Sequence, residues 1–493
     1  MLSKSRILAL RQCRRRLWLE VNRPELRIFA AETRRRFAQG HQLNTVVRQL
    51  YPDGVLIDDQ VALGAALRLT ARHLDRTPDT PLFEATFSKH RILVRADLFT
   101  HTAEGFELTE VKSSTRVKPY HLIDCAVQNW VITEAGYPIA KTVLAHIDTR
   151  FLYRGNDDYA GLLRHVDVTE RLVDLLPEVP EWVAGGLDTL SSHDEPDIRV
   201  GPHCNNPFAC PFLDHCSPTK TEYPVTLLPG GGRIIRELIE HGVEDVRDIP
   251  SERLHKPLHQ RVHQATLSGL PYIGPEIGQA LGALPYPRYY LDFESVQFVI
   301  PRWADTRPYQ QLPFQWSCHI ESAPDSVRHT DFLHTAVGPP MRACADTLIE
   351  ALGSEGPIFC YSRYERTVIH QLAARFPDLK SRLHSLAERL FDLLPLIREH
   401  YYHPAMKGSY SIKAVLPTVA PDLRYEGLGE VHDGVGAQIA YEELIDDETP
   451  DARRAVLVNE LKEYCRLDTL AMVRLVQFFD RKAVRSDGWR PPR

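Results

Sequence analysis

Residues 91–114, RILVRADLFTHTAEGFELTEVKSS, read as a β-hairpin around which the first part of the chain can be arranged. The first arm, residues 91–100, is rich in β-branched and aromatic residues. Residues 103–105, Ala-Glu-Gly, supply a turn, and residues 106–112 form the second arm. The stretch therefore predicts two adjacent antiparallel strands.

One face of the second arm is apolar in its first half and charged in its second half. Alternation along a strand places four side chains on this face: Phe106, Leu108, Glu110 and Lys112. Burying a charge is costly unless it is paired or bound to a metal, and Asp97 on the neighbouring arm offers a second carboxylate. The three polar side chains predict a site for one hard divalent cation, with the ammonium free to orient a water or a phosphate oxygen. The alternative is a solvated cross-strand pair on an exposed sheet face.

The spacing of these acids carries a family resemblance. Asp97 lies thirteen residues before Glu110, and Glu84 lies in the preceding apolar segment PLFEATF. Together with the Glu110-x-Lys112 triplet, the pattern resembles the PD-(D/E)xK nuclease superfamily in its RecB-like branch. The resemblance implies a restriction-endonuclease-like αβββαβ core. It also implies that Asp97, Glu110 and Glu84 bind Mg²⁺ or Mn²⁺ while Lys112 stabilises developing charge.

A helix expected over residues 119–135 extends this resemblance. It places Gln128 where the RecB-like branch has the glutamine of a Q-x-x-x-Y motif, which implies a role in the site. The fourth residue after Gln128 is Ile132 rather than tyrosine, so the motif is incomplete.

Nine cysteines, an odd number, argue against a disulfide scaffold and favour a reducing compartment, so we expect a cytoplasmic protein. Cys204, Cys210 and Cys216 follow one another with five residues between each pair, in a loop-like run. A shared ligand explains such a triplet, and Cys13 is the candidate fourth thiolate. Reduced core cysteines are the alternative, which suits the remaining five better than the triplet. Zinc and iron both accept four thiolates.

An N-terminal cysteine and a C-terminal triplet that bracket a RecB-like core resemble the iron–sulfur nucleases of the AddAB helicase and of CRISPR adaptation. In those families the ligands hold a 4Fe–4S cluster. The resemblance therefore implies a structural 4Fe–4S cluster on Cys13, Cys204, Cys210 and Cys216.

The composition is that of a globular protein of more than one domain: 493 residues, 43% hydrophobic and 25% charged, with a formal net charge of -6. Arginines and a lysine crowd the first forty residues, which suits a phosphate backbone as well as a solvated helix face. No run is long and apolar enough for a membrane helix. We expect a nucleic-acid partner, single-stranded DNA or DNA ends, and no membrane.

A second set of acids lies in the last two fifths of the chain. The segment RYYLDFES, residues 288–295, reads as a strand with Asp292 and Glu294 on one face, which suits a two-metal site. A strand expected at 357–365 ends at Glu365, while Asp392 in RLFDLLPL competes with it as a third acid. We favour Glu365.

The last acid comes from a strongly amphipathic helix expected from Leu461 onward. Its apolar stripe includes Tyr464 and Asp468, and an aspartate on a buried face is rarely structural unless it is capped or paired. The two positions form a Y-x-x-x-D pattern.

These motifs together resemble the DEDD family of 3′–5′ exonucleases, in its tyrosine subtype, on an RNase H-like fold. The resemblance implies that Asp292, Glu294 and Asp468 hold two divalent metals, that Glu365 completes the set, and that Tyr464 positions the attacking water. The polar segment 407–417, KGSYSIKAVLP, suits a nucleic-acid strand, with an ordinary loop as the alternative.

We expect three domains: a RecB-like nuclease at 1–217, a helical linker at 218–285 and an RNase H-like domain at 286–493. The linker is either helix-hairpin-helix-like or an ordinary spacer. This order resembles a bacterial family of two-nuclease proteins and implies a metal-dependent DNA exonuclease with two active sites, serving repair or defence by analogy. The alternative is a nucleic-acid-binding or scaffold protein in which one or both sites are inactive.

Overall fold

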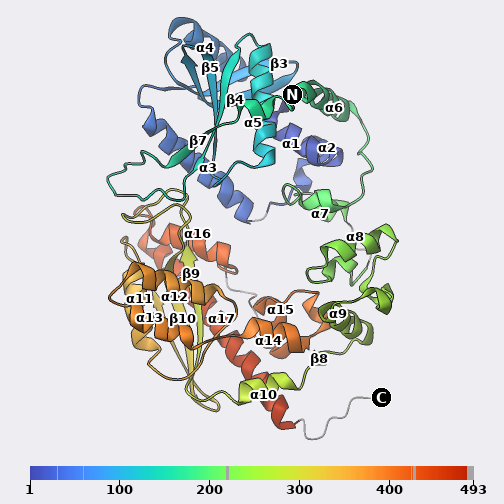
Figure 1. The fold of residues 1–493 in the computed structure, drawn as a ribbon, viewed down its shortest axis with the longest axis vertical. Helices are drawn as coiled ribbons and strands as arrows, with labels where there is room; N and C mark the ends of the chain where they lie inside the picture. Colours follow the sequence, from blue (N-terminus) through green and yellow to red (C-terminus); the bar gives the residue numbers. More distant parts are fainter. Residues whose placement is uncertain (30, 59, 218–220, 424, 426–428, 486–493) are drawn as a thin grey trace. The chain divides into compact units, whose positions relative to one another are not determined.

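The structure, a computed structural model, describes residues 1–29, 31–58, 60–217, 221–423, 425 and 429–485. The chain is a mixed α/β protein that divides into two compact units (Figure 1). The first is Met1–Pro218 with Phe298–Gln310, and the second is Thr219–Gln297 with Gln311–Arg493. Among the described residues, no helix combines the length and apolar character needed to cross a membrane.

The division differs from the three expected domains in two respects. Residues expected to form a separate linker at 218–285 fall in the second unit, where Val225, Leu238 and Val262 share a hydrophobic core with Tyr290. The segment Phe298–Gln310 follows the strand Arg288–Val296 of the second unit but belongs to the first unit, because Val299 joins a core there. Burial of apolar side chains, rather than order along the chain, sets these boundaries.

The first unit is built on a mixed sheet of seven strands in the order β2-β3-β4-β5-β6-β7, with β1 beside β4. The strands are β1 (Leu2–Ser3), β2 (Val55–Leu56), β3 (Leu82–Lys89), β4 (Ile92–Thr102), β5 (Gly105–Lys112), β6 (Ile139–Ile147) and β7 (Leu163–Asp167). β4 and β5 form the expected antiparallel hairpin, with Phe99 opposite Leu108, and β5 runs parallel to β6.

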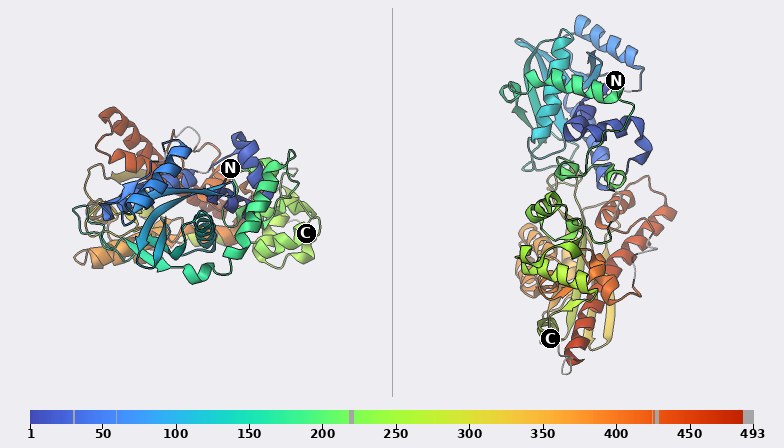
Figure 2. Two further views of the ribbon diagram at one scale, coloured as in Figure 1. Left: turned by 90° about the horizontal axis from the view of Figure 1, so that it is seen from above. Right: turned by 90° about the vertical axis from the view of Figure 1, so that its right-hand side faces the viewer.

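Seven helices of the first unit are α1 (Lys4–Gln12), α2 (Arg14–Asn22), α3 (Ala31–Leu50), α4 (Leu63–Arg76), α5 (Pro119–Glu134), α6 (Val179–Ser191) and α7 (Leu213–Cys216). α5 packs on β3, β4 and β6, over one face of the sheet (Figures 1 and 2). The start of the chain forms two helices, because the backbone of Cys13 is extended (φ -167°, ψ 126°) between α1 and α2. Cys13 therefore lies between the two helices rather than within either of them.

The second unit contains a five-stranded sheet in the order β11-β10-β9-β12-β13. Its strands are β9 (Arg288–Val296), β10 (Leu312–Ala323), β11 (Ser326–Leu333), β12 (Ile358–Cys360) and β13 (Leu390–Asp392). β9, β10 and β11 pair antiparallel, whereas β12 is parallel to both β9 and β13. A separate antiparallel pair joins β8 (Tyr272–Ile273) to β14 (Tyr401–Tyr402).

The helices of the second unit are α8 (Gly232–Glu240), α9 (Pro257–Ser268), α10 (Glu276–Gly282), α11 (Met341–Ala351), α12 (Tyr364–Arg375), α13 (Lys380–Glu388), α14 (Leu393–His400), α15 (Ile412–Val419), α16 (Gly434–Leu444) and α17 (Asp451–Arg485). α17 starts ten residues before the expected Leu461 and packs on β9 and β10. Its buried stripe includes Leu461, Met472 and Leu475, as the pattern predicts. The strand expected at 357–365 is shorter, and its last residues begin α12.

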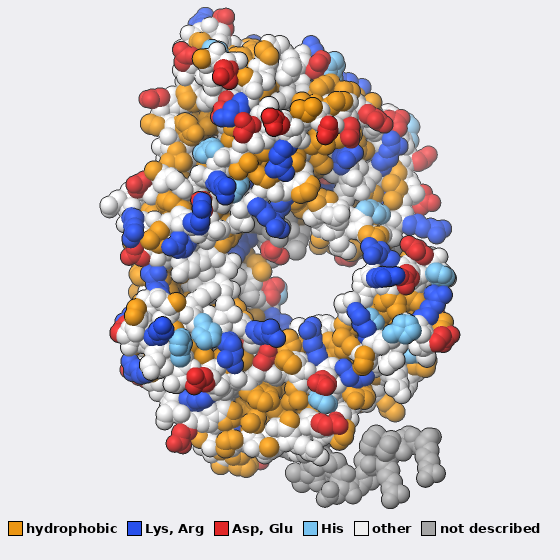
Figure 3. Space-filling view, in the orientation of Figure 1, with side chains coloured by type: hydrophobic (Ala, Val, Ile, Leu, Met, Phe, Trp, Pro, Cys, Tyr) orange, Lys and Arg blue, Asp and Glu red, His pale blue; other side chains and the backbone are white. Residues whose placement is uncertain are grey.

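The visible surface mixes charges of both signs. Acidic and basic side chains alternate over the face shown in Figure 3, in keeping with the small net charge. The charge distribution on this face therefore does not single out a binding surface.

Candidate functional site

The first group of acids lies where β4 and β5 pair. Glu110 and Lys112 come from β5, and Asp97 comes from β4. Lys112 Nζ donates to Glu110 Oε1 at 2.7 Å, and the backbone N–H of Val111 donates to Asp97 Oδ2 at 2.7 Å. The hairpin thus brings together the two carboxylates and the ammonium that its sequence singled out.

Helix α5 supplies two more polar side chains to this group. Gln128 Nε2 donates to Glu110 Oε2 at 2.7 Å, so Gln128 holds a carboxylate of the site. Asp124, one helical turn earlier, accepts from Lys112 Nζ at 2.8 Å through Oδ2. Sequence reasoning missed Asp124, although its place four residues before Gln128 puts both on one helix face. Ile132, which stands where the family motif has tyrosine, is fully buried in the core.

The start of α1 adds a second ammonium that sequence reasoning also missed. Lys4 Nζ lies 2.8 Å from Glu110 Oε1, 2.9 Å from Glu110 Oε2 and 3.9 Å from Asp97 Oδ1. No local pattern could have found it, because 106 residues separate Lys4 from Glu110.

Glu84 lies beside the same group. The pairing of Phe83 with Leu98 and of Ala85 with Ala96 places Glu84 opposite Asp97. Glu84 has a left-handed backbone (φ 54°), a conformation that a glutamate in a strand adopts at a cost on the order of 1–3 kcal/mol. Both carboxylates line one small pocket. The strained backbone at this point is typical of a functional position.

Burial and neighbouring charges push the two central carboxyls in opposite directions. Burial, reinforced by the negative charges of Glu110 and Glu84, raises the pKa of Asp97 to about 7. Burial also acts on Glu110, but the ammoniums of Lys112 and Lys4 outweigh it and hold the pKa of Glu110 well below its usual range. Glu110 is therefore the permanent anion of the group.

The second group of acids joins β9 to α17. Asp292 and Glu294 come from β9 and Asp468 from α17, and their ligand atoms lie within 4.8 Å of one another. Among the residues that the structure describes, these are the only three His, Cys, Asp or Glu side chains that meet in this way. Alternation along β9 and the buried stripe of α17 explain why all three point to one place.

Two tyrosines and a lysine surround Asp468. Tyr425 OH donates to Asp468 Oδ1 at 2.6 Å. Lys413 Nζ donates to Tyr464 OH at 3.2 Å and to the backbone oxygen of His432 at 2.6 Å. Tyr464 thus lies at the acid group, one turn before Asp468 on α17. Tyr425 and the particular role of Lys413, which lies in the polar segment 407–417, were not found from sequence.

The structure treats the two candidates for the third acid differently. Glu365 lies in the first turn of α12, is buried, and accepts a hydrogen bond from Ser362 Oγ at 3.1 Å. Its negative charge adds to the effect of burial in raising the pKa of both Asp292 and Glu294. Asp392 instead caps α14, where Oδ1 accepts from the backbone N–H of Leu394 at 3.0 Å. Asp392 therefore has a local structural role, whereas the negative charge of Glu365 contributes to the shifts at Asp292 and Glu294.

Burial shifts the pKa of every carboxyl in this group upward, and repulsion between neighbouring carboxylates adds to the shift at Asp292 and Glu294. Burial and the neighbouring carboxylates raise the pKa of Asp292 and Glu294 well above the ordinary range. Burial also raises the pKa of Asp468, and it raises that of Glu365 to about 7. Such a group charges fully only when a cation compensates it.

These shifts predict a pH dependence of stability. Carboxyls with raised pKa values hold protons in the folded chain that the unfolded chain releases, so the contribution of this group to the free energy of unfolding falls as pH rises from about 4 through about 7. We expect this contribution to lower the melting temperature in EDTA over this window. Mn²⁺ should restore it, with a larger effect at about pH 8 than at about pH 5, because the cation replaces the protons.

The Asp292→Asn variant isolates the contribution of the second group. One carboxyl fewer should flatten the pH dependence in EDTA and reduce the stabilisation by Mn²⁺. Scanning calorimetry of both proteins measures this, and parallel curves for the two proteins would contradict the assignment.

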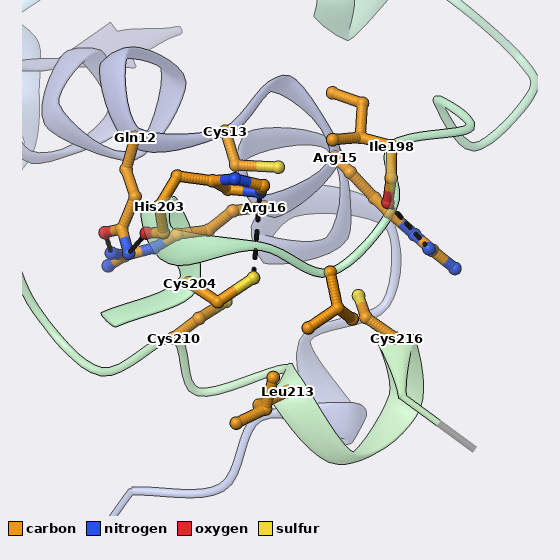
Figure 4. Close-up of a pocket in the computed structure, with 11 residues that line it drawn as sticks. Gln12, Cys13, Arg15, Arg16, Ile198, His203, Cys204, Cys210, Leu213 and Cys216 are labelled. Atoms are coloured by element: carbon orange, nitrogen blue, oxygen red, sulfur yellow. Dashed lines mark hydrogen bonds between the residues drawn. The ribbon is translucent and has the colours of Figure 1, made fainter. Parts of the chain in front are cut away.

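The four cysteines singled out above line one pocket of the first unit (Figure 4). Cys13 projects from the junction of α1 and α2, and Cys204, Cys210 and Cys216 come from residues 201–216, here called the cysteine loop. All four are free thiols. The other five cysteines are buried, as expected for reduced core residues.

Hydrogen bonds tie the cysteine loop to the end of α1. Gln12 Nε2 donates to the backbone oxygens of His203 at 2.7 Å and Phe208 at 2.8 Å. The N–H of Cys210 donates to the oxygen of Cys204 at 2.7 Å, which folds the loop back on itself. Burial raises the pKa of Cys216 to about 11, so binding a metal there must release a proton.

The comparisons with known proteins add one finding. The family described as Domain of unknown function (DUF2779) matches residues 289–411. The matched segment contains Asp292, Glu294 and Glu365 but ends before Tyr464 and Asp468. No curated protein matches the chain. The fold and sites thus define a mixed α/β protein of two units with two groups of buried acids and one cysteine pocket.

Proposed function

We propose that the chain is a metal-dependent nuclease that hydrolyses phosphodiester bonds of DNA at two active sites. The observation that carries the proposal is the group of Asp292, Glu294 and Asp468, with ligand atoms within 4.8 Å of one another. Buried carboxylates at this distance repel one another, and divalent cations are the usual compensation for such a set.

The carboxylates of the second group suit Mg²⁺ or Mn²⁺, because both ions prefer oxygen ligands. Such ions, when bound, lower the pKa of water and neutralise charge on the phosphate. In the proposed mechanism Tyr464 orients the attacking water through its hydroxyl, which Lys413 holds at 3.2 Å. Tyr425 fixes one oxygen of Asp468, so that the other stays directed to the reaction centre.

The topology supports an exonuclease of the DEDD type with tyrosine. The strand order β11-β10-β9-β12-β13, with the first acids on the central strand and the last on a helix packed across it, agrees with the RNase H-like fold that the sequence resembles. We propose that this site removes nucleotides from a 3′ end, with Glu365 as the remaining acid.

The first unit supports a nuclease of the RecB-like PD-(D/E)xK type. Its elements follow the order α4-β3-β4-β5-α5-β6, which is the expected αβββαβ series. The ammonium of Lys4 between Asp97 and Glu110 is a stand-in for a cation, so these carboxylates suit a divalent ion. We propose that both, with Glu84, hold one ion, and that Lys112 stabilises charge on the phosphate while Gln128 orients Glu110.

We propose a structural 4Fe–4S cluster for the cysteine pocket. All four thiols line one pocket of the first unit, which suits a metal group shared by four thiolates. The choice of iron over zinc rests on the resemblance to the iron–sulfur nucleases. Nine free cysteines also support a reducing compartment, which we propose is the cytoplasm.

The test is degradation of 5′- and 3′-labelled single-stranded DNA with Mn²⁺. We expect Asp97→Ala and Asp292→Ala each to remove a distinct cleavage pattern and the double variant to remove all cleavage. RNA of the same sequence serves as the competing substrate. An intact protein that binds both nucleic acids without cutting either would instead favour a binding or scaffold protein with inactive sites.

A further inference from the structure

Lys4 has a fixed backbone at the edge of the first site. β1 pairs with β4, with Leu2 opposite Ile92, and Leu2 is buried. Ile7 and Ala9 of α1 are fully buried as well, and α1 contacts α5 and β4. The four-carbon stem of a lysine is flexible, so the ammonium of Lys4 can move while its backbone stays in place.

That ammonium lies between the carboxylates that would bind a divalent ion. It donates to both oxygens of Glu110, at 2.8 and 2.9 Å, and lies 3.9 Å from Asp97 Oδ1. An ion bound to the same oxygens at about 2.0–2.6 Å would lie so close to the ammonium that the two positive charges repel strongly. The ammonium and the ion therefore exclude each other.

We propose that Lys4 fills the cation position of the first site in the metal-free protein, and that a divalent ion enters only by displacing its ammonium. This inference rests on the proposed role of Asp97 and Glu110 as metal ligands. Lys4 then sets the metal affinity of the site, whereas Lys112 stays in place because Asp124 also holds it, at 2.8 Å.

The displaced ammonium needs a new anionic partner. Because the backbone of Lys4 is fixed, the ammonium remains beside the site, and a phosphate oxygen of a bound strand is the partner of opposite charge. Each ligand thus favours the other, so the ion and the nucleic acid bind cooperatively. Without a strand, Lys4 keeps the affinity of the site for the ion low.

The experiment measures Mn²⁺ binding by electron paramagnetic resonance, in the full chain with Asp292→Asn and Asp468→Asn to silence the second site. Glu110→Gln in the same background gives the baseline without first-site binding. We expect Lys4→Met to bind Mn²⁺ about tenfold more tightly than the chain with Lys4. A non-cleavable phosphorothioate strand should tighten Mn²⁺ binding with Lys4 present and leave Lys4→Met unchanged.

Two variants serve as controls. Lys4→Arg keeps the charge and should keep the weak affinity and the effect of the strand. Lys141→Met removes an exposed partner of Glu107 on the same sheet, 2.9 Å away, and should change neither. Lys4→Met should remain folded because Glu110 keeps Lys112 and Gln128 as partners, and a melting curve checks this.

The role of Lys4 would be wrong if Lys4→Met bound Mn²⁺ no more tightly than the chain with Lys4. It would also be wrong if the strand still tightened Mn²⁺ binding in Lys4→Met. Either result would leave the metal assignment of the first site in place. If neither protein binds Mn²⁺ above the Glu110→Gln baseline, the metal assignment of the first site fails, and the role of Lys4 fails with it.

Discussion

Asp468→Asn is expected to reduce release of nucleotides from a 3′ end about 10³-fold, which corresponds to about 4 kcal/mol of transition-state stabilisation. The neutral amide keeps the shape of the side chain but removes one of three charges that hold the ions. The assay uses the Asp97→Ala background, so that only the second site acts. Without metal, the same change should raise the melting temperature, because it relieves repulsion with Asp292 and Glu294.

A pair of variants at the third acid sharpens this prediction. Glu365→Gln should also lower 3′-end release strongly, because its charge acts on Asp292 and Glu294. Asp392→Asn is the matched control: asparagine caps a helix about as well as aspartate does, so α14 and the activity should both persist. If Asp392→Asn abolished activity and Glu365→Gln did not, the third acid would be Asp392.

Cys204→Ser is expected to remove the metal group of the first unit and most of the stability of that unit. Purified wild-type protein should be brown, with iron and acid-labile sulfide in equal amounts, and the variant should be colourless. A structural metal site commonly contributes several kcal/mol to folding. The variant should therefore lose the low-temperature melting transition that the first unit gives in the wild-type protein. Cys344→Ala, at a buried thiol of α11, is the control that should keep the colour.

Loss of the cysteine group should also weaken the first acid site. α1 carries Lys4 at its start and is followed directly by Cys13, and Gln12 fastens its end to the cysteine loop. The ring of Phe208 in that loop lies 4.6 Å from the ring of Tyr120 on α5, the helix of Gln128. Cys204→Ser should therefore lose cleavage by the first site and keep 3′-end release by the second. Zinc in place of iron, with colourless active protein, would contradict the cluster.

Local periodicity was sufficient to place most of the acids. Alternation along a strand determines that Asp292 and Glu294 share a face, and the 3.6-residue repeat of a helix puts Tyr464 and Asp468 on one stripe. Which side chains share a face is fixed within one strand or helix, so it does not depend on what that element packs against. The cysteine triplet was visible for the same reason, as a regular spacing within one loop.

Contacts between distant segments could be decided only by the tertiary structure. Lys4 reaches Glu110 across 106 residues, and Tyr425 reaches Asp468 across 43. The structure also distinguishes Glu365 from Asp392, since the charge of Glu365 acts on Asp292 whereas Asp392 caps a helix. The sequence by itself determined which side chains share a face. Which faces meet depends on how the elements bury their apolar surface together, and no local pattern encodes that.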